Sequence, residues 1–177
     1  KKFLSKKENF LPAKKKKIAA RLSIINYILE DIEMKYQITE KTIPAAVVYY
    51  SETTLERHQD VMQWIPSLGK EFLQLNPGIK CAEPAYEFCE YLDGEYREKQ
   101  IHIRHNEAVA SRGMESGRIK FREIPETRVI SIYHKGPYER IGEAYAYIMR
   151  YAEENGYQIT GPARECYIDG IWNKDSE

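Results

Sequence analysis

The first clear hydrophobic pattern along the chain is helical and runs from about residue 13 to residue 36, after a polar connector. Its apolar side chains recur at alternating steps of four and three residues, the spacing of a coiled-coil seam or an amphipathic helix. They are Ile18, Leu22, Ile25, Leu29, Ile32 and Tyr36. The pattern predicts a helix that packs either on its own domain or against a second copy of the chain. We favour the second copy, because the four lysines at residues 14–17 oppose the helix dipole and gain nothing in a purely local helix.

After residue 36 the chain shows one pattern of strands and helices twice. In each copy an Ile-Pro pair precedes a run of β-branched and aromatic residues, and proline is tolerated where a strand begins. These elements are Ile43-Pro44 with residues 46–50, and Ile124-Pro125 with residues 128–133. A helical pattern follows each strand, over about residues 55–75 with an interruption at Pro66, and over about residues 138–155.

Two further strands follow each helix, and an Asp-Gly pair between them favours a tight hairpin turn. The pairs are Asp93-Gly94 and Asp169-Gly170. The fourth strand of the first copy is the alternating stretch at residues 100–109. Superposing the copies places Glu177 near Ile101, so the last strand of the second copy is expected to be absent from this sequence.

This repeat predicts an α+β fold. Two strand-helix-strand-strand units are expected to form an antiparallel sheet with helices on one face and a groove between the units. We expect residues 1–36 to form the connector and the amphipathic helix. Residues 37–177 would then form one domain, with halves at about residues 37–109 and 118–177.

Strand alternation indicates which side chains of the second copy face this groove, because successive residues point to opposite faces. The apolar residues Cys166 and Ile168 fit beneath a helix. Glu165 and Tyr167 are therefore expected to face the groove.

The same argument applies to the third strand of the first copy. Phe88 is expected beneath the helix, so that Glu87, Cys89 and Tyr91 point to the groove. Aligning the two copies on their Asp-Gly pairs or on their prolines gives the same assignment of faces.

Tyr50 and Tyr133 end the first strands of the two copies and are expected at the mouth of the groove. The result is a candidate pocket with one or two carboxylates ringed by tyrosines. An organic cation could pair with the carboxylate, and the ring faces would add cation–π attraction. Alternatively, Glu165 pairs with Arg128 or Arg164 on a solvated sheet face while the tyrosines pack as cross-strand pairs. Spacing alone leaves both readings open.

Charge and composition narrow the class of partner. Acidic and basic side chains balance at 27 each, so the whole chain shows no attraction to nucleic acid or to an anionic membrane. No apolar run reaches the roughly 20 residues that cross a bilayer, and we expect no membrane partner. The three cysteines form no C-x-x-C pair, which favours a reducing, cytoplasmic compartment over a disulfide framework or a zinc site. Fourteen tyrosines suit a pocket or an interface.

We expect no metal and no nucleotide cofactor. His102 and His105 share one strand, but their odd separation places them on opposite faces. Gly136-Pro137 is a turn into a helix and lacks the glycine-rich loop that cradles phosphates. Trp64 and Trp172 are expected to serve in packing.

Several short motifs in this order resemble those of GyrI-like domains. They are His134-Lys135-Gly136-Pro137-Tyr138, Gly156-Tyr157, Gly161-Pro162 and Glu165-Cys166-Tyr167. The resemblance covers the chain from about residue 36 to its end. The segment Ile43-Pro44-Ala45 after an amphipathic helix resembles the multidrug-sensing, BmrR-like regulators of the MerR type, in which the long helix dimerises and leads to a DNA-binding domain.

The resemblance implies a cytoplasmic effector-binding domain of a transcriptional regulator, with a hydrophobic, aromatic or cationic small molecule as ligand. It also implies that Glu165 stands at the base of the pocket and that the tyrosines form its walls. Homodimerisation is expected through the N-terminal helix, and DNA binding only through an upstream domain outside this chain. Two alternatives remain, a hydrolase of cyclopropane-type electrophiles with Glu165 as acid or base, and a gyrase-inhibitor-like protein-binding domain. We regard the enzyme as the less favoured of these classes.

Overall fold

The computed structural model describes residues 14–15, 17–26 and 36–168. The chain divides into two compact units. Unit 1 comprises Lys1–Lys41 with Arg128–Ile159, and unit 2 comprises Thr42–Thr127 with Thr160–Glu177. Each unit therefore takes residues from both copies of the sequence repeat.

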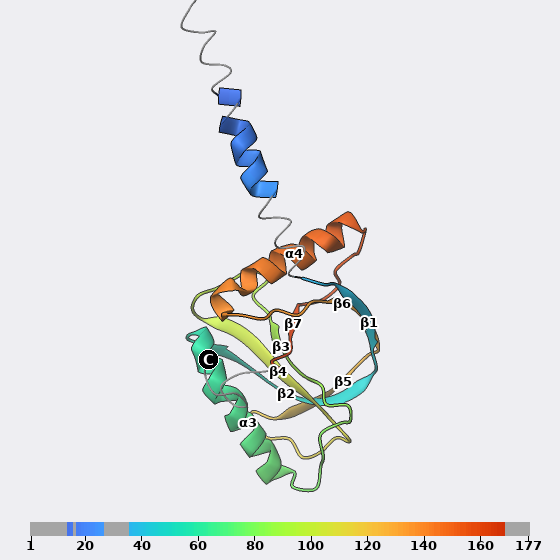
Figure 1. The fold of residues 1–177 in the computed structure, drawn as a ribbon. Helices are drawn as coiled ribbons and strands as arrows, with labels where there is room; N and C mark the ends of the chain where they lie inside the picture. The colour runs from blue at the N-terminus through green and yellow to red at the C-terminus, as the bar shows by residue number, and fades with distance from the viewer. Residues whose placement is uncertain (1–13, 16, 27–35, 169–177) are drawn as a thin grey trace, which may run out of the picture. The chain divides into compact units, whose positions relative to one another are not determined.

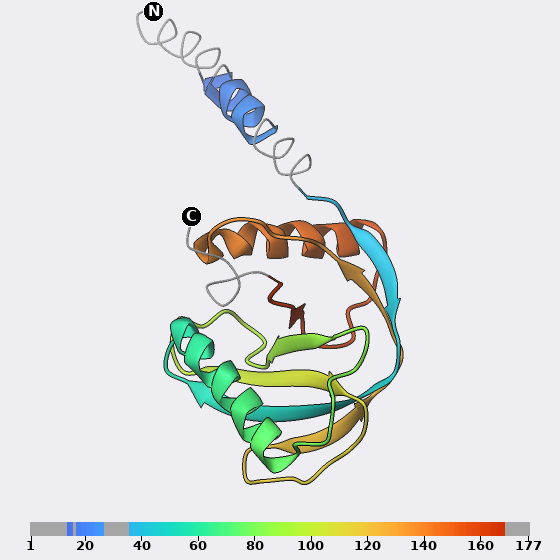
Figure 2. The ribbon, with the colours of Figure 1, turned by 60° about the horizontal axis from the view of Figure 1, so that its bottom comes forward.

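Unit 2 is built on a five-stranded antiparallel sheet in the order β5-β2-β4-β3-β7 (Figure 1). Its strands are β2 (Ala46–Leu55), β3 (Glu87–Tyr91), β4 (Ile101–Val109), β5 (Lys120–Ile124) and β7 (Arg164–Glu165). The helix α3 (Val61–Leu75) follows a short 3-10 turn, η1 (His58–Asp60), and lies along one face of the sheet (Figure 2).

The main core of unit 2 lies between α3 and the sheet. Leu68 and Phe72 stand one turn apart on α3, so they share the face that meets the strands. The ring of Phe72 stacks on that of Tyr49 from β2 at 4.2 Å between centroids. Val109, Ile119 and Phe121 complete this cluster. Burying a side chain of this size stabilises the fold by about 1.5–3 kcal/mol, which fixes α3 on this face.

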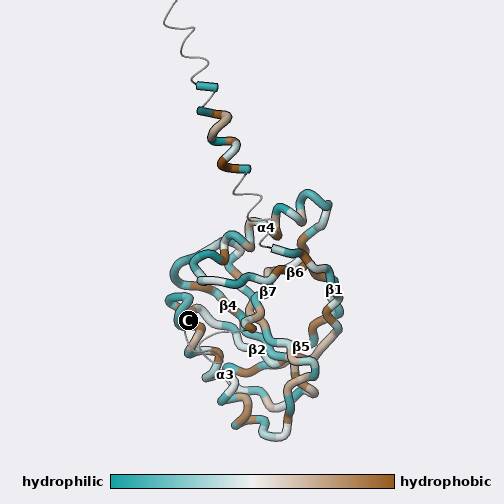
Figure 3. Tube along the Cα trace, viewed as in Figure 1, coloured by the Kyte–Doolittle hydropathy of each residue, from teal (hydrophilic) through white to brown (hydrophobic). Residues whose placement is uncertain are grey.

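Unit 1 contains the helix α4 (Ile141–Glu154), which follows the 3-10 turn η2 (Tyr138–Arg140). Tyr36 is buried there against His134 and Tyr147, and its hydroxyl bonds the His134 ring nitrogen at 2.9 Å. Residues 17–26 are helical, in agreement with the sequence pattern. Figure 3 shows hydrophobic positions along this helix interspersed with hydrophilic ones.

The strands β1 (Thr39–Ile43) and β6 (Thr127–Ser131) pair with each other in a separate two-stranded sheet. Pro44 thus lies between β1 and β2, and Pro125 lies between β5 and β6. The strand before each proline pairs with the first strand of the other copy, β5 with β2 and β1 with β6. The sequence pattern located the strands after the prolines but not β1 and β5.

The α+β class and the antiparallel pairing predicted from the sequence are confirmed. The first copy follows the predicted order, with β2, α3, β3 and β4 in succession. Pro66 lies inside α3 without interrupting it. The second Asp-Gly pair, Trp172 and much of the N-terminal helix lie outside the described residues.

Two local predictions were wrong. Phe88 lies on the sheet face opposite α3, where it packs with Val48, Ala108 and Ile124. The prediction failed because three successive residues of β3, Phe88 to Glu90, are all buried, so apolarity does not distinguish the faces of this strand. The link between β3 and β4 is also no tight turn, since it spans residues 92–100, with Gly94 at φ 74°.

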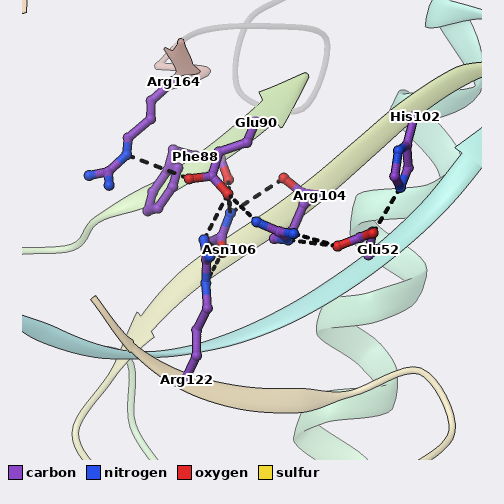
Figure 4. A network of polar contacts seen from close by, with 8 residues as sticks. All are labelled: Glu52, Phe88, Glu90, His102, Arg104, Asn106, Arg122 and Arg164. Atoms are coloured by element: carbon purple, nitrogen blue, oxygen red, sulfur yellow. Dashed lines mark hydrogen bonds and ion pairs between the residues drawn. The ribbon is translucent and has the colours of Figure 1, made fainter. Parts of the chain in front are cut away.

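The face opposite α3 carries a polar network that we call the Glu90 cluster: Glu90, Arg104, Asn106, Arg122 and Arg164 (Figure 4). Glu90 is only 4% exposed. Arg122 donates to it at 2.7 Å and Arg104 at 3.1 Å, while Arg164 forms an ion pair at 3.7 Å. Asn106 donates to the same carboxylate at 3.4 Å.

These guanidinium groups come from three different strands. Arg122 belongs to β5 at one edge of the sheet, Arg164 to β7 at the other edge, and Arg104 to β4 between them. Because Glu90 stands on β3, its carboxylate links both edges of the sheet to its centre. Such a buried charge is tolerated only where charged donors surround it.

Replacing Glu90 by glutamine should lower the free energy of unfolding by about 3–5 kcal/mol, because three guanidinium groups lose their shared buried counter-charge. Urea denaturation measures this loss. The matched control is Glu123→Gln on β5, whose side chain is 73% exposed and pairs with Arg112 at 3.4 Å. The control should lose less than about 1 kcal/mol. Equal losses in the two variants would contradict this role of Glu90.

Candidate ligand-binding site

A group of acidic and tyrosine side chains lies on the α3-facing side of β3 and β7. Glu165 of β7 stands directly opposite Cys89 of β3. Since side chains alternate along a strand, Glu87 and Tyr91 share the face of Cys89. Tyr167 packs with Cys89 and Tyr91 in a small core that includes Val61 of α3.

Hydrogen bonds join the two tyrosines to the carboxylate of Glu165. The Tyr167 hydroxyl donates to Glu165 Oε2 at 3.0 Å. The hydroxyls of Tyr91 and Tyr167 are 2.8 Å apart. Burial, and then the charge of Glu165, raise the pKa of Tyr167 well above its usual range. The phenol therefore keeps its proton and holds the carboxylate in one orientation.

A second acidic centre lies on the same face, where Glu87 of β3 stands opposite Glu107 of β4. Like charges placed directly opposite each other are destabilising. Burial, and then the charge of Glu107, raise the pKa of Glu87 above its usual value. Tyr49 and Cys81 donate hydrogen bonds to Glu107 at 2.5 and 2.8 Å. Among the described residues, neither Glu87 nor Glu107 forms an ion pair with lysine or arginine.

The thiols beside these carboxylates stay protonated. The hydrogen bond to Glu107 is the main reason that the pKa of Cys81 rises to about 11. Burial, followed by the charges of Glu165 and Glu87, raises the pKa of the Cys89 thiol well above its usual range. Both carboxylates thus lie near Cys89. Glu165 stands opposite Cys89, and Glu87 precedes Cys89 by two residues. Glu87 and Glu165 are therefore diagonal neighbours, a position in which the Cα atoms lie about 7–8 Å apart.

His105 is the basic group nearest to Glu87, with its Nδ1 atom 3.8 Å from the carboxylate. Its ring is fully buried beneath Trp64 and Tyr49. Burial lowers the pKa of His105 to about 4, against the opposing effect of Glu107. The imidazole is therefore neutral near pH 7 and supplies no positive charge to Glu87.

Four of the six residues singled out in the sequence share this face, and we call them the acid–tyrosine cluster: Glu87, Tyr91, Glu165 and Tyr167. The other two lie elsewhere. Tyr50 is on the opposite face of the sheet, where the guanidinium groups of Arg104 and Arg122 cover its ring at 5.8 and 5.5 Å. Tyr133 belongs to unit 1 and is 67% exposed.

Arg128 and Arg164 were the ion-pair partners of Glu165 that the sequence left open, and both arginines pair with other carboxylates. Arg164 forms its ion pair with Glu90, and Arg128 pairs with Glu40 at 2.6 Å. Glu107 was missed by the sequence reasoning, although the alternating pattern of residues 100–109 would have placed it on the face of His105.

The two histidines of β4 lie on opposite faces, as predicted. His102 pairs with Glu52 at 2.8 Å on the face away from α3, and His105 lies beneath the helix. Within residues 14–15, 17–26 and 36–168, no three His, Cys, Asp or Glu side chains are grouped to hold a metal ion.

A polar hollow of about 350 Å³ lies at a separate place in unit 2, where β2 continues past the end of β5. It is lined by Tyr50, Glu52, Thr53, Thr54, His102, Gly117, Arg118 and Lys120. None of these residues belongs to the acid–tyrosine cluster. Its lining combines acidic and basic side chains, whereas the tyrosines of the acid–tyrosine cluster pack beside Trp64 in one hydrophobic cluster.

The acid–tyrosine cluster can attract a cation and contact an apolar surface at the same time. Its carboxylates supply negative charge, and its phenol rings supply the ring faces that bind organic cations. The neutral His105 adds no positive charge that would compete with a cationic ligand. The protonated thiols of Cys81 and Cys89 are also uncharged. This combination of groups makes the cluster the candidate site for a small organic molecule.

Comparison with known proteins identifies the class. The model of the GyrI-like small molecule binding domain matches residues 34–177, and the chain belongs to this family. No curated protein matches the chain.

Two solved structures are similar to it. The crystal structure of the EcmrR C-terminal domain is 41% identical with a TM-score of 0.74, over 78% of this chain and 88% of that one. EcmrR in the cryo-EM structure of the EcmrR-DNA complex in EcmrR-RPo is 36% identical with a TM-score of 0.78. That match covers 98% of this chain and 66% of the EcmrR chain, so this chain spans about two thirds of that relative. The resemblance to the effector-binding domain of MerR-type regulators is confirmed.

Among the helices in the described part of the chain, none combines the length and the apolar character needed to cross a membrane.

The buried His105 should make stability depend on pH. Its folded-state pKa of about 4 lies below the unfolded value of about 6.5, so the unfolded state takes up the proton first as the pH falls. The stabilising contribution is present above pH 6.5 and is lost as the pH falls towards 4. The full loss is about 3 kcal/mol, at 1.36 kcal/mol for each pKa unit.

Urea denaturation of wild type and His105→Leu across this range tests the assignment, and the variant should lose less stability on acidification. Leu73→Gln on α3 is the control, because Leu73 is exposed and carries no titratable group, so this variant should keep the wild-type pH dependence. An identical pH dependence in wild type and His105→Leu would disprove it.

Proposed function

We propose that this chain is the effector-binding domain of a transcriptional regulator and that it binds hydrophobic organic cations at the acid–tyrosine cluster. The observation that carries the proposal is the Glu165 carboxylate, held by the Tyr167 hydroxyl at 3.0 Å on the same sheet face as Tyr91 and Glu87. The family supports a small-molecule ligand. The similarity to EcmrR in its complex with DNA supports a regulatory role in a longer protein.

Charge selects the ligand class in this proposal. A cation close to a carboxylate gains about 4 kcal/mol at an effective dielectric constant of 20, before desolvation is counted. Removing both groups from water consumes much of this gain and leaves about 1–2 kcal/mol. Ring faces contribute about 0.5–2 kcal/mol each, and this part does not depend on Glu165. The site should therefore bind neutral aromatic compounds and prefer cationic ones.

Self-association is a second part of the proposed function. Along the described helix, Ile18, Leu22 and Ile25 are 52%, 54% and 50% exposed. Their steps of four and three residues place them on one face of the helix. We propose that a second copy of the chain covers this face, since an apolar stripe with this spacing is typical of paired helices.

The charge of Glu165 should control the preference for cations. Glu165→Gln keeps the size of the side chain, and it should weaken binding of tetraphenylphosphonium about ten- to thirtyfold while changing the affinity for neutral triphenylphosphine oxide little. Tyr167→Phe should have a smaller effect, because it keeps the charge of Glu165 and the ring face and loses only the hydrogen bond that orients the carboxylate. Calorimetric titration measures both ligands, and Glu83→Gln, an exposed carboxylate in the loop before β3, is the control. Unchanged cation affinity in Glu165→Gln would rule out this site.

The dimer is tested by sedimentation equilibrium at micromolar concentration. Wild type should sediment as a dimer and Leu22→Glu as a monomer, because the charge would be buried in the paired face. Leu73→Glu on α3 is the matched control, since Leu73 is also an exposed helical leucine, at 59%. A monomeric wild type would refute the assignment.

A further inference from the structure

We propose that Arg164 is a positioning residue for the ligand site, although it stands on the opposite face of the sheet. By pairing with Glu90, Arg164 fixes the short strand that presents Glu165 to the ligand. This inference rests on the proposed function, because it concerns the same carboxylate.

The strand that carries Glu165 has little pairing of its own. β7 consists of Arg164 and Glu165, and within the described part of the chain it pairs with β3 alone. In the register, Glu165 stands opposite Cys89 and Arg164 opposite Glu90. Two residue pairs provide few backbone hydrogen bonds to offset the entropy of ordering a strand. Side chains must therefore supply much of what holds β7 in place.

Arg164 supplies several such contacts, all to residues of β3 or just before it. Its Nε atom lies 3.7 Å from Glu90, and its Nη1 atom donates to the Tyr86 hydroxyl at 3.1 Å. Its guanidinium plane covers the ring of Phe88 at 4.7 Å. A planar guanidinium group can pair and stack at once, which an ammonium group cannot do.

The anchor point is itself rigid. Glu90 is buried, and Arg122 and Arg104 hold its carboxylate from β5 and β4. Arg164 therefore ties β7 to a group that the rest of the sheet already fixes (Figure 4). Because adjacent residues point to opposite faces, fixing Arg164 on one face sets the position of Glu165 on the other.

Loss of the contacts of Arg164 should affect the binding of charged ligands more than that of neutral ones. If β7 shifts, the distance from Glu165 to a bound cation changes, and the Coulomb attraction falls with that distance. A neutral ligand has no such contact with Glu165 and depends on the ring faces. Loss of the anchor should therefore lower the preference for cations rather than binding in general.

The experiment compares Arg164→Gln with Arg122→Gln. Both variants remove one guanidinium group from Glu90, but Arg122 stands on β5 at the far edge of the sheet and does not adjoin Glu165. Each protein is titrated with tetraphenylphosphonium and with triphenylphosphine oxide, and the ratio of the two affinities is compared with that of wild type. Thermal unfolding verifies that each variant is folded at the temperature of titration.

We expect Arg164→Gln to lower the cation preference about tenfold and Arg122→Gln to change it less than about twofold. The cation preference of Arg164→Lys should lie between those of Arg164→Gln and wild type. Lysine keeps a positive charge beside Glu90 but loses the stacking on Phe88. It also serves as the test if Arg164→Gln does not fold. Equal losses in the Arg164 and Arg122 variants would overturn the inference, as would an unchanged preference in both. Glu165→Gln separates the two claims. If Glu165→Gln keeps the wild-type cation preference, the proposed function is wrong. If Glu165→Gln loses the preference while Arg164→Gln keeps it, only the role of Arg164 is wrong.

Discussion

The carboxylate of Glu90 holds together the sheet on which the ligand site is built. It is buried on β3 and receives guanidinium groups from β4, β5 and β7, which include both edges of the sheet. Hydrophobic packing with α3 fixes one face of the sheet, whereas this charge network fixes the other. The two edge strands are short, so an interaction that reaches across the sheet matters more here than in a sheet with long edges.

The three arginines of the five-stranded sheet all lie on one face. Arg104, Arg122 and Arg164 lie on the face away from α3, together with Glu90, whereas Glu87, Glu107 and Glu165 lie on the side of α3. The neighbours Arg164 and Glu165 show the separation most clearly, because alternation directs them to opposite faces. The three arginines are thus engaged with Glu90 on the face away from Glu87, Glu107 and Glu165.

Much of the fold follows from local patterns in the sequence. The Ile-Pro pairs, the alternating stretch at residues 100–109 and the helix stop signals were sufficient to predict the class of fold and most of its elements. The strand β5 was not predicted, because Lys120, Arg122 and Glu123 make it polar for its length. The face of Phe88 was predicted wrongly, because β3 is buried on both sides and its apolar residue does not mark the helix side.

The candidate site was predictable in part. Glu87, Tyr91, Glu165 and Tyr167 share one face as predicted, because alternation fixes which residues do so. That face was predicted to point away from the helix, whereas it faces α3. Tyr50 could not be excluded from sequence, because the face that it shares is set by the register of β2 against β4, where Tyr50 stands opposite Asn106. The Glu90 cluster was not foreseen for the same reason, since its members are distant in the sequence and meet only through the order of the strands.

A crystal structure of the chain with tetraphenylphosphonium tests the central claim most directly. The account predicts that the phosphonium centre lies on the α3-facing side of β3 and β7, with a phenyl group against Tyr91 or Tyr167 and the cation within about 6 Å of a tyrosine ring and beside Glu165. A ligand bound on the opposite face, against Tyr50 or in the polar hollow at the end of β5, would contradict it.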